Sequence, residues 1–264
     1  MYVVTSLNIS ISLPLTLLAI YGVYSLLQNN HAARTYIINL LISDLIQLCC
    51  MIVWVARRDD MKIMRVVNVF YFCSLMASIG FMVCLALERY LLISCPMWYR
   101  FRQTIKISVV VCVMVWVLTL VCVLILHFWG DFMSQKIVIG IFFLLPLPLL
   151  IFFLGGTIRA LSASRVPSDE KRRIVGILVL VLLIYVLLFM PRTICNLADG
   201  YIYDHTLFNL SFVFLQLSPL ADVCLYVFMR KGTIDKLLAS VCCCRMDSND
   251  SSRIDSNEIS SSTM

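Results

Sequence analysis

Residues 66–94 read VVNVFYFCSLMASIGFMVCLALERYLLIS, and the only charged residues in this stretch are Glu88 and Arg89, near its end. A helix needs about 20 apolar residues to cross the roughly 30 Å hydrocarbon core of a bilayer, and this stretch exceeds that length. The rest of the chain has the same character, because 61% of its residues are hydrophobic and 14% are charged. The composition therefore predicts a membrane protein.

Six other runs are comparably long and apolar. The seven predicted spans cover residues 9–27, 36–56, 66–94, 107–128, 137–158, 174–195 and 207–229. Backbone groups inside a bilayer must hydrogen-bond to one another, and these runs lack the alternating pattern of barrel strands, so we expect helices. The predicted fold class is all-α, with one seven-transmembrane helix bundle in residues 1–229.

Most Lys and Arg residues fall in the intervals on one side of the predicted spans. Because the cytoplasmic side carries more basic residues, we expect a multi-pass plasma-membrane protein with an extracellular N-terminus. The net charge of +6 then reflects topology, and nucleic acid is not an expected partner. Residues 1–27 lack a basic start and a cleavage site, so we expect them to remain as the first helix. The sequon Asn8-Ile9-Ser10 makes Asn8 a candidate glycosylation site, although it lies close to the membrane.

The tail changes character after the seventh span. Residues 230–245 are predicted to form an amphipathic helix on the inner membrane surface, because their apolar residues recur with helical spacing. The cysteines Cys242, Cys243 and Cys244 beside it are candidates for palmitoylation, or they are ordinary reduced thiols. Residues 246–264 are rich in Ser, Asn and Asp and are predicted to be disordered. Membrane lipids are therefore expected partners of this chain.

The charged pair at the end of the third span has two interpretations. A basic side chain at the end of a span can simply reach the lipid headgroups. Alternatively, the carboxylate of Glu88 holds the Arg89 guanidinium in one position until a competing partner arrives.

Five short motifs lie on different predicted spans. They are Glu88-Arg89-Tyr90, Asn39-Leu40-Leu41-Ile42-Ser43-Asp44, Trp116, Phe189-Met190-Pro191 and Asp222-Val223-Cys224-Leu225-Tyr226. In this arrangement they resemble the motifs of the rhodopsin-like (class A) G-protein-coupled receptors, and the resemblance covers residues 9–244. The short loop at residues 159–165 is similar to that of the branch that holds proton-sensing and lysolipid receptors.

The resemblance implies a receptor that switches between two states and acts on a heterotrimeric G protein. The sixth helix is expected to swing outward, pivoting near Pro191 and repacking Tyr185 and Phe189. Arg89 then leaves Glu88 and faces the Gα subunit. The chain is not expected to be an enzyme, because no nucleophile with a base, metal cluster or phosphate loop emerges.

Two departures from the family pattern leave room for a second interpretation. The predicted loop before the fifth span has no cysteine for the usual outer disulfide. Val223 stands where the seventh-helix proline is expected, and Pro219 lies one turn earlier, so we expect the kink to move by about 5.4 Å along the axis. The alternative function is a weakly coupled pseudo-receptor that acts through a receptor dimer or through trafficking.

Besides Glu88, the predicted spans contain two acidic residues, Asp44 and Asp222, at positions where an unpaired charge costs about 2.5–3.5 kcal/mol. The resemblance implies that Asp44, Ser78, Ser218 and Asp222 meet around a water-filled pocket that admits a sodium ion in relatives. Two carboxylates in such a site cannot both be ionised cheaply. They hold a proton or a cation, or they form a neutral structural pair. Apart from a sodium ion, no cofactor or metal is expected.

Two kinds of ligand are compatible with the sequence. If Arg192 turns inward, it offers a guanidinium to an anionic lipid or metabolite, and otherwise it reaches the outer headgroups. The apolar walls of such a site are expected from Tyr71, Leu75, Phe189 and Phe212. A proton is the other candidate ligand, because His127 and His205 lie near the outer face and histidine titrates between about pH 5 and 8. Thr119 stands where proton-sensing relatives carry an acid, which counts against that alternative.

Overall fold

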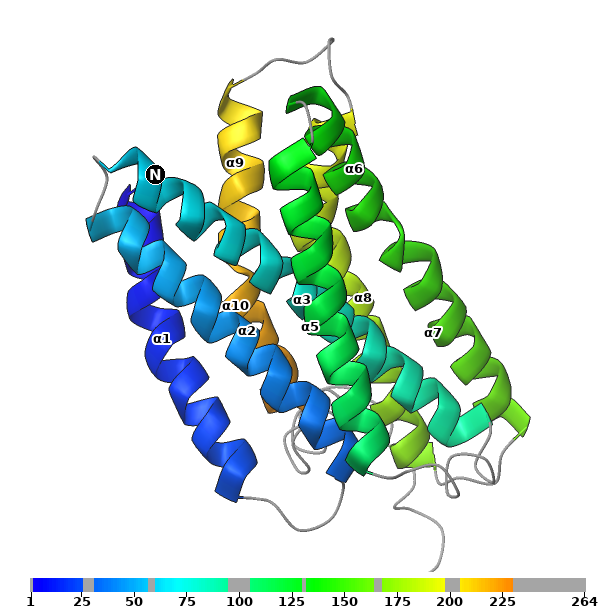
Figure 1. Cartoon of the computed structure of the whole chain (residues 1–264). Coiled ribbons are helices and arrows are strands. Elements are labelled where there is room, and N and C mark those ends of the chain that lie inside the picture. Colours follow the sequence, from blue (N-terminus) through cyan, green and yellow to red (C-terminus); the bar gives the residue numbers. More distant parts are fainter. Residues whose placement is uncertain are drawn as a thin grey trace, which may run out of the picture. The chain divides into compact units, whose positions relative to one another are not determined.

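The computed structural model describes residues 2–25, 31–56, 60–94, 105–129, 132–163, 168–197 and 205–229. Nearly all of these residues are helical and none of them is in a strand, which confirms the all-α prediction. The helices are α1 (Tyr2–Ser25), α2 (His31–Ala56), α3 (Met61–Ser94), α5 (Ile105–Trp129), α6 (Phe132–Leu144), α7 (Pro146–Ala163), α8 (Ser168–Leu197), α9 (His205–Gln216) and α10 (Ser218–Met229). They run alongside one another as a bundle (Figure 1).

The described helices form seven segments that are long and apolar enough to cross a membrane, as the sequence predicts. Residues 1–226 form one compact unit, and a second begins at residue 227. The arrangement described below is that of the first unit. The predicted amphipathic helix at 230–245, the cysteines Cys242, Cys243 and Cys244, and the tail at 246–264 lie outside the described residues.

Several helices start earlier than the predicted spans do. Helix α1 begins at Tyr2 and α3 begins at Met61, whereas hydropathy alone predicts that these spans begin at residues 9 and 66. Asp60 explains the early start of α3, because its side-chain Oδ1 accepts hydrogen bonds from the backbone N–H groups of Lys62 and Ile63 at 3.1 and 3.4 Å. Such a cap satisfies amide groups that have no partner within the helix. A helix therefore continues past the apolar run that identifies it.

Two predicted spans are each broken into two helices. The predicted span at 137–158 comprises α6 and α7, which meet at a turn at Leu145, immediately before Pro146. The predicted span at 207–229 comprises α9 and α10, which meet at Leu217, two residues before Pro219. Proline removes a backbone donor and its ring clashes with the preceding turn. The second break lies where the displaced Pro219 predicts it, whereas the apolar pattern does not predict the first.

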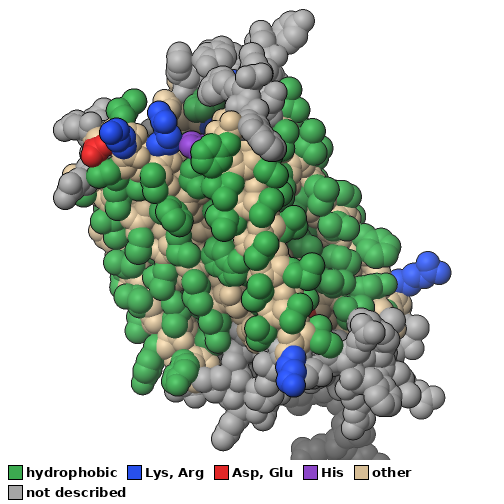
Figure 2. Space-filling model, viewed as in Figure 1, with side chains coloured by type: hydrophobic (Ala, Val, Ile, Leu, Met, Phe, Trp, Pro, Cys, Tyr) green, Lys and Arg blue, Asp and Glu red, His purple; other side chains and the backbone are tan. Residues whose placement is uncertain are grey.

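Helix α3 is the centre of the bundle, and it packs against α2, α5, α7 and α8. It is also the most buried span. In its most apolar stretch 67% of the residues are buried inside the protein, whereas in the corresponding stretch of α5 only 17% are buried. Hydrophobic side chains cover the visible flank, and the visible Lys and Arg side chains lie towards the two ends (Figure 2). This distribution suits a bundle whose sides face lipid.

Candidate functional site

The acidic residues of the second and seventh spans face each other inside the bundle. Asp44 on α2 and Asp222 on α10 are both fully buried, and their carboxyl groups interact. The hydroxyl of Ser78, on α3, donates a hydrogen bond of 3.0 Å to Asp222 Oδ2. Ser218 is also fully buried and lies one turn before Asp222 on α10. Three segments distant in the sequence thus contribute to one buried polar cluster.

This cluster has more polar atoms than partners among the described residues. Both carboxyl oxygens of Asp44, the Oδ1 of Asp222 and the hydroxyl of Ser218 have no hydrogen-bond partner there. The same holds for both side-chain polar atoms of Gln47, which is one turn from Asp44 on α2. Buried polar groups are nearly always satisfied in proteins. Carboxylate and hydroxyl oxygens suit a hard cation, and a proton shared by the two acids would meet the same demand.

The Glu88-Arg89-Tyr90 motif lies near the end of α3 and is partly packed into the bundle. Glu88 is 7% exposed and lies close enough to Tyr36 of α2 to affect it electrostatically. The Nε of Arg89 has no hydrogen-bond partner among the described residues. The pairing of Glu88 with Arg89 stays a prediction.

The tyrosine of this motif packs against α7. The ring of Tyr90 stacks on Phe153, with 5.7 Å between the ring centroids. It also lies directly over Gly156, where an added Cβ would come within 2.6 Å of the ring. In the same way, a Cβ at Gly22 on α1 would lie 2.6 Å from the hydroxyl of Tyr226. Both motif tyrosines therefore occupy space that a glycine leaves open, and the motifs themselves do not indicate these glycines.

The residues around the expected pivot form an aromatic cluster. Tyr185 and Phe189 of α8 stack with 5.1 Å between their ring centroids, and Phe143 of α6 packs against Phe189 at 5.8 Å. The buried hydroxyl of Tyr185 donates a hydrogen bond to the backbone carbonyl of Phe143. This carbonyl is among the last four of α6, which have no N–H partner within the helix because α6 ends at Leu144. Tyr185 thus fixes the break between α6 and α7 to α8.

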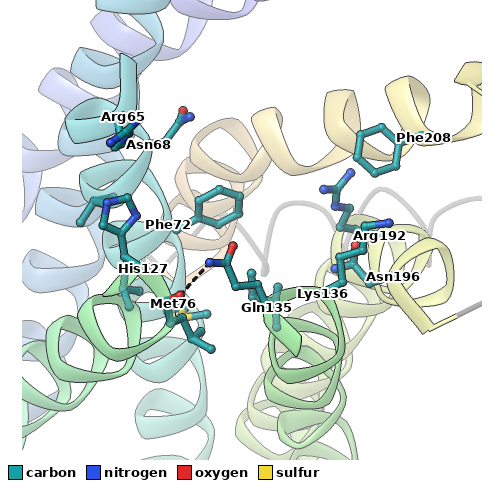
Figure 3. A pocket seen from close by; sticks show the side chains of 14 residues that line it. Arg65, Asn68, Phe72, Met76, His127, Gln135, Lys136, Arg192, Asn196 and Phe208 are labelled. Carbon is teal, nitrogen blue, oxygen red and sulfur yellow. Dashed lines mark hydrogen bonds between the residues drawn. The ribbon is translucent and has the colours of Figure 1, made fainter. Parts of the chain in front are cut away.

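A cavity of about 350 Å³ opens at the end of the bundle where α3, α6 and α9 begin and α5 and α8 end. Its lining residues are Arg65, Asn68, Val69, Phe72, Met76, Val123, Leu126, His127, Gln135, Lys136, Ile139, Arg192, Asn196 and Phe208. Three of them are Lys or Arg and none is acidic. We call this space the basic cavity (Figure 3).

Arg192 lies in the wall of the basic cavity, which corresponds to the inward alternative for this residue. Its guanidinium carbon lies 4.0 Å from the centroid of the Phe208 ring, a cation–π contact. Its Nη1 is buried and has no hydrogen-bond partner among the described residues. A buried guanidinium N–H without a partner costs free energy, so binding of a ligand that offers a hydrogen-bond acceptor to Arg192 would be favourable.

The residues predicted as apolar walls of the ligand site do not line the basic cavity, and their role stays a prediction. Tyr71 and Leu75 are fully buried and do not line the basic cavity, and neither do Phe189 and Phe212. Tyr71 and Phe212 instead pack against Trp54 of α2, at centroid distances of 4.6 and 5.7 Å. The walls come from neighbouring positions such as Phe72 and Met76. One residue along a helix turns the side chain by about 100°, and α3 is apolar on every side, so its sequence does not reveal which face meets the cavity.

Of the two histidine candidates, His127 lies at the basic cavity. His127 is exposed and lines the basic cavity. The side chain of His205 lies outside the described residues.

The structure argues against glycosylation of Asn8. This residue is 5% exposed, inside α1, and its amide donates a hydrogen bond to the backbone carbonyl of Gln216. Its side-chain oxygen accepts a hydrogen bond of 2.8 Å from Ser12. Gln216 is the last residue of α9, so Asn8 satisfies a carbonyl at the break before α10. A side chain used in this way is inaccessible to a glycosylating enzyme.

Comparison with known proteins agrees with this architecture. Residues 15–226 match the family model described as 7 transmembrane receptor (rhodopsin family). The chain is 24% identical over 266 residues to Mas-related G-protein coupled receptor member A4 of Mus musculus, a match that covers 85% of this chain and 82% of that receptor. It is 22% identical over 265 residues to G-protein coupled receptor 68 of Homo sapiens, covering 84% of this chain and 71% of the receptor. A third match, to G-protein coupled receptor 68 of Mus musculus, is 26% identical over 113 residues and covers 40% of this chain and 31% of the receptor.

These relatives are receptors, which confirms the predictions of a rhodopsin-like receptor and of a chain that is not an enzyme. The family match extends from the first span to the last motif of the seventh, over residues 15–226. The chain belongs to the rhodopsin family of seven-transmembrane receptors.

Proposed function

We propose that this chain is a plasma-membrane receptor that binds a small amphipathic anion in the basic cavity and passes the signal to a heterotrimeric G protein. The observation that carries the proposal is Arg192, which lines this cavity and has a buried Nη1 without a hydrogen-bond partner among the described residues. The N-terminus and the basic cavity are extracellular in this proposal, and the tail is cytoplasmic.

The chemistry of the cavity wall supports an anion with an apolar part. The described wall carries no acid, so the charge of a cationic ligand would meet only basic and neutral side chains. Arg192 presents a planar fork that suits a carboxylate or phosphate. Val69, Phe72 and Met76 supply apolar surface beside it. Pockets of this kind combine mostly apolar walls with a few polar groups that orient the ligand.

The position of Arg192 supports transmission through α8. It follows Pro191 directly, and Tyr185 and Phe189 lie one to two turns earlier on the same helix. A ligand shifts a conformational equilibrium only when it binds one state better than the other. We infer that an anion on Arg192 favours the state in which the far end of α8 moves outward. Arg89 then becomes available to the Gα subunit.

The buried acidic cluster has a regulatory role in this proposal. Asp44 and Asp222 hold a sodium ion or a proton in the resting state, with Ser78 and Ser218 as supporting oxygens. The unsatisfied carboxyl oxygens of Asp44 support this role. A bound sodium ion would offset one of the two negative charges, and Asp44, Asp222, Ser78 and Ser218 would supply its ligands.

A proton is the second candidate signal, because exposed His127 lines the same cavity. Acidification would then activate the receptor with no anion added, and His127→Gln would remove that response. A pseudo-receptor that acts by dimerisation or trafficking would show neither response.

The test is G-protein dissociation in cells that express the full-length chain, with fatty acids, lysophosphatidate and short dicarboxylates as probes. We expect Arg192→Gln to raise the half-maximal concentration of active anions tenfold or more, because a buried hydrogen bond to a charged group contributes about 1.5–3 kcal/mol. Lys62→Gln is the matched control, because Lys62 is exposed near the same end of the bundle and does not line the cavity. Unchanged potency of every anionic agonist on Arg192→Gln would overturn the proposal.

A further inference from the structure

The basic groups of the cavity lie on opposite walls. Arg192 comes from α8 and Lys136 from α6, whereas Arg65 comes from α3. Figure 3 shows Arg65 and His127 on one side of the space and Arg192, Lys136 and Phe208 on the other. The cavity therefore has two separate basic ends.

The surface between these ends is mainly apolar, with one fixed amide. Phe72 and Met76 line the space between the two walls (Figure 3). Gln135 also lies there, and its Nε2 donates a hydrogen bond of 2.7 Å to the backbone carbonyl of Leu126. An acidic group would be stabilised at either end of the cavity, and a hydrocarbon segment would be favoured in the middle.

The two ends differ in their exposure to solvent. Arg192 is partly buried, with a fully buried Nη1, whereas Arg65 and His127 are exposed. A charge pair at the Arg192 end would be poorly screened and strongly orienting. A pair at the Arg65 end would be screened by water and salt and would raise affinity by at most about fivefold.

We propose that the ligand carries two acidic groups separated by an apolar segment, with one group on Arg192 and the other near Arg65. This inference rests on the proposed function and specifies the class of ligand. A volume of about 350 Å³ is at the lower end of the range for small-molecule sites, about 300–1,000 Å³. The size favours a dicarboxylate or a comparable two-ended metabolite over a two-chain lipid.

The experiment compares octanedioate with octanoate, which differ only in the second carboxylate. Binding to the purified full-length receptor is measured at low and high salt by competition and by thermal stabilisation, which ligand binding produces by mass action. Hexanedioate and dodecanedioate are included to cover other spacings between the two acidic groups. The variants are Arg65→Gln, Arg192→Gln and the control Lys62→Gln, which removes one positive charge a turn away from Arg65.

We expect octanedioate, or the best-fitting diacid, to bind up to about fivefold tighter than octanoate at low salt, and less so at high salt. Arg65→Gln should remove this preference and leave octanoate binding unchanged, and Lys62→Gln should retain the preference. Arg192→Gln should weaken both probes about tenfold.

Equal binding of diacids and octanoate would overturn the two-ended ligand while leaving the anion receptor in place. A preference that Lys62→Gln removes as fully as Arg65→Gln does would also overturn it, because the effect would then be one of general charge. If no probe binds, or if Arg192→Gln weakens none of them, the proposed function fails and the two-ended ligand fails with it.

Discussion

The hydrogen bond from Tyr185 to the carbonyl of Phe143 connects the expected pivot in α8 to the break between α6 and α7. Tyr185→Phe keeps the ring stacked on Phe189 and removes only the hydroxyl. Leaving a buried backbone carbonyl unsatisfied costs about 1–3 kcal/mol. For a domain of this size, each kcal/mol lowers the melting temperature by about 2–4 °C, so we expect a decrease of about 5 °C.

The same substitution should also change signalling. A cost of 1.4 kcal/mol corresponds to a tenfold shift in an equilibrium between two conformations. States that lack the contact between α6 and α8 therefore become about tenfold more populated, and ligand-independent G-protein activation should rise. The measurements are thermal unfolding of the purified receptor and second-messenger production without agonist. Tyr21→Phe is the control, because Tyr21 is 72% exposed on α1. A Tyr185→Phe receptor with wild-type melting and wild-type basal activity would refute this reasoning.

Three further substitutions test other parts of the structure. Asp222→Asn removes one carboxylate of the buried pair, so we expect agonist potency to lose its dependence on sodium concentration; a retained sodium effect would contradict the ion site. Gly156→Ala places a methyl group 2.6 Å from the Tyr90 ring. Overpacking of this kind costs about 1–3 kcal/mol and should weaken G-protein activation. Gly155→Ala is the control, because a Cβ there meets no atom within 4 Å and should leave activation unchanged. Asn8→Ala should lower the free energy of unfolding by about 1–3 kcal/mol, measured by denaturation in detergent, and unchanged stability would show that its hydrogen bonds are unimportant.

Hydropathy was sufficient for the spans because the bilayer imposes their length. It did not reveal the break at Leu145, although Pro146 follows it, because a proline inside an apolar run can end a helix or merely bend it. The early start of α3 was also missed, since Asp60 lies outside the apolar run and acts through its cap. Local backbone hydrogen bonding therefore determines where these helices begin and end, which the apolar pattern does not predict.

The candidate site was less predictable than the fold. The sequence indicates Arg192 as a candidate because it directly follows Pro191 and can turn inward. The sequence does not show which face of α3 meets the basic cavity, because this helix has no continuous polar stripe to orient it. Gln47 and Phe143 were missed for another reason. Their roles depend on neighbours from other helices, and their own sequence context gives no sign of them.

The absence of acidic side chains from the described wall of the basic cavity has a practical consequence for pharmacology. A protonated amine would place its charge beside Arg65, Lys136 and Arg192, which repel it. Fragment libraries of carboxylates, tetrazoles and sulfonates are the better starting material. A medicinal chemist would then extend a hit from the Arg192 end towards the more exposed rim.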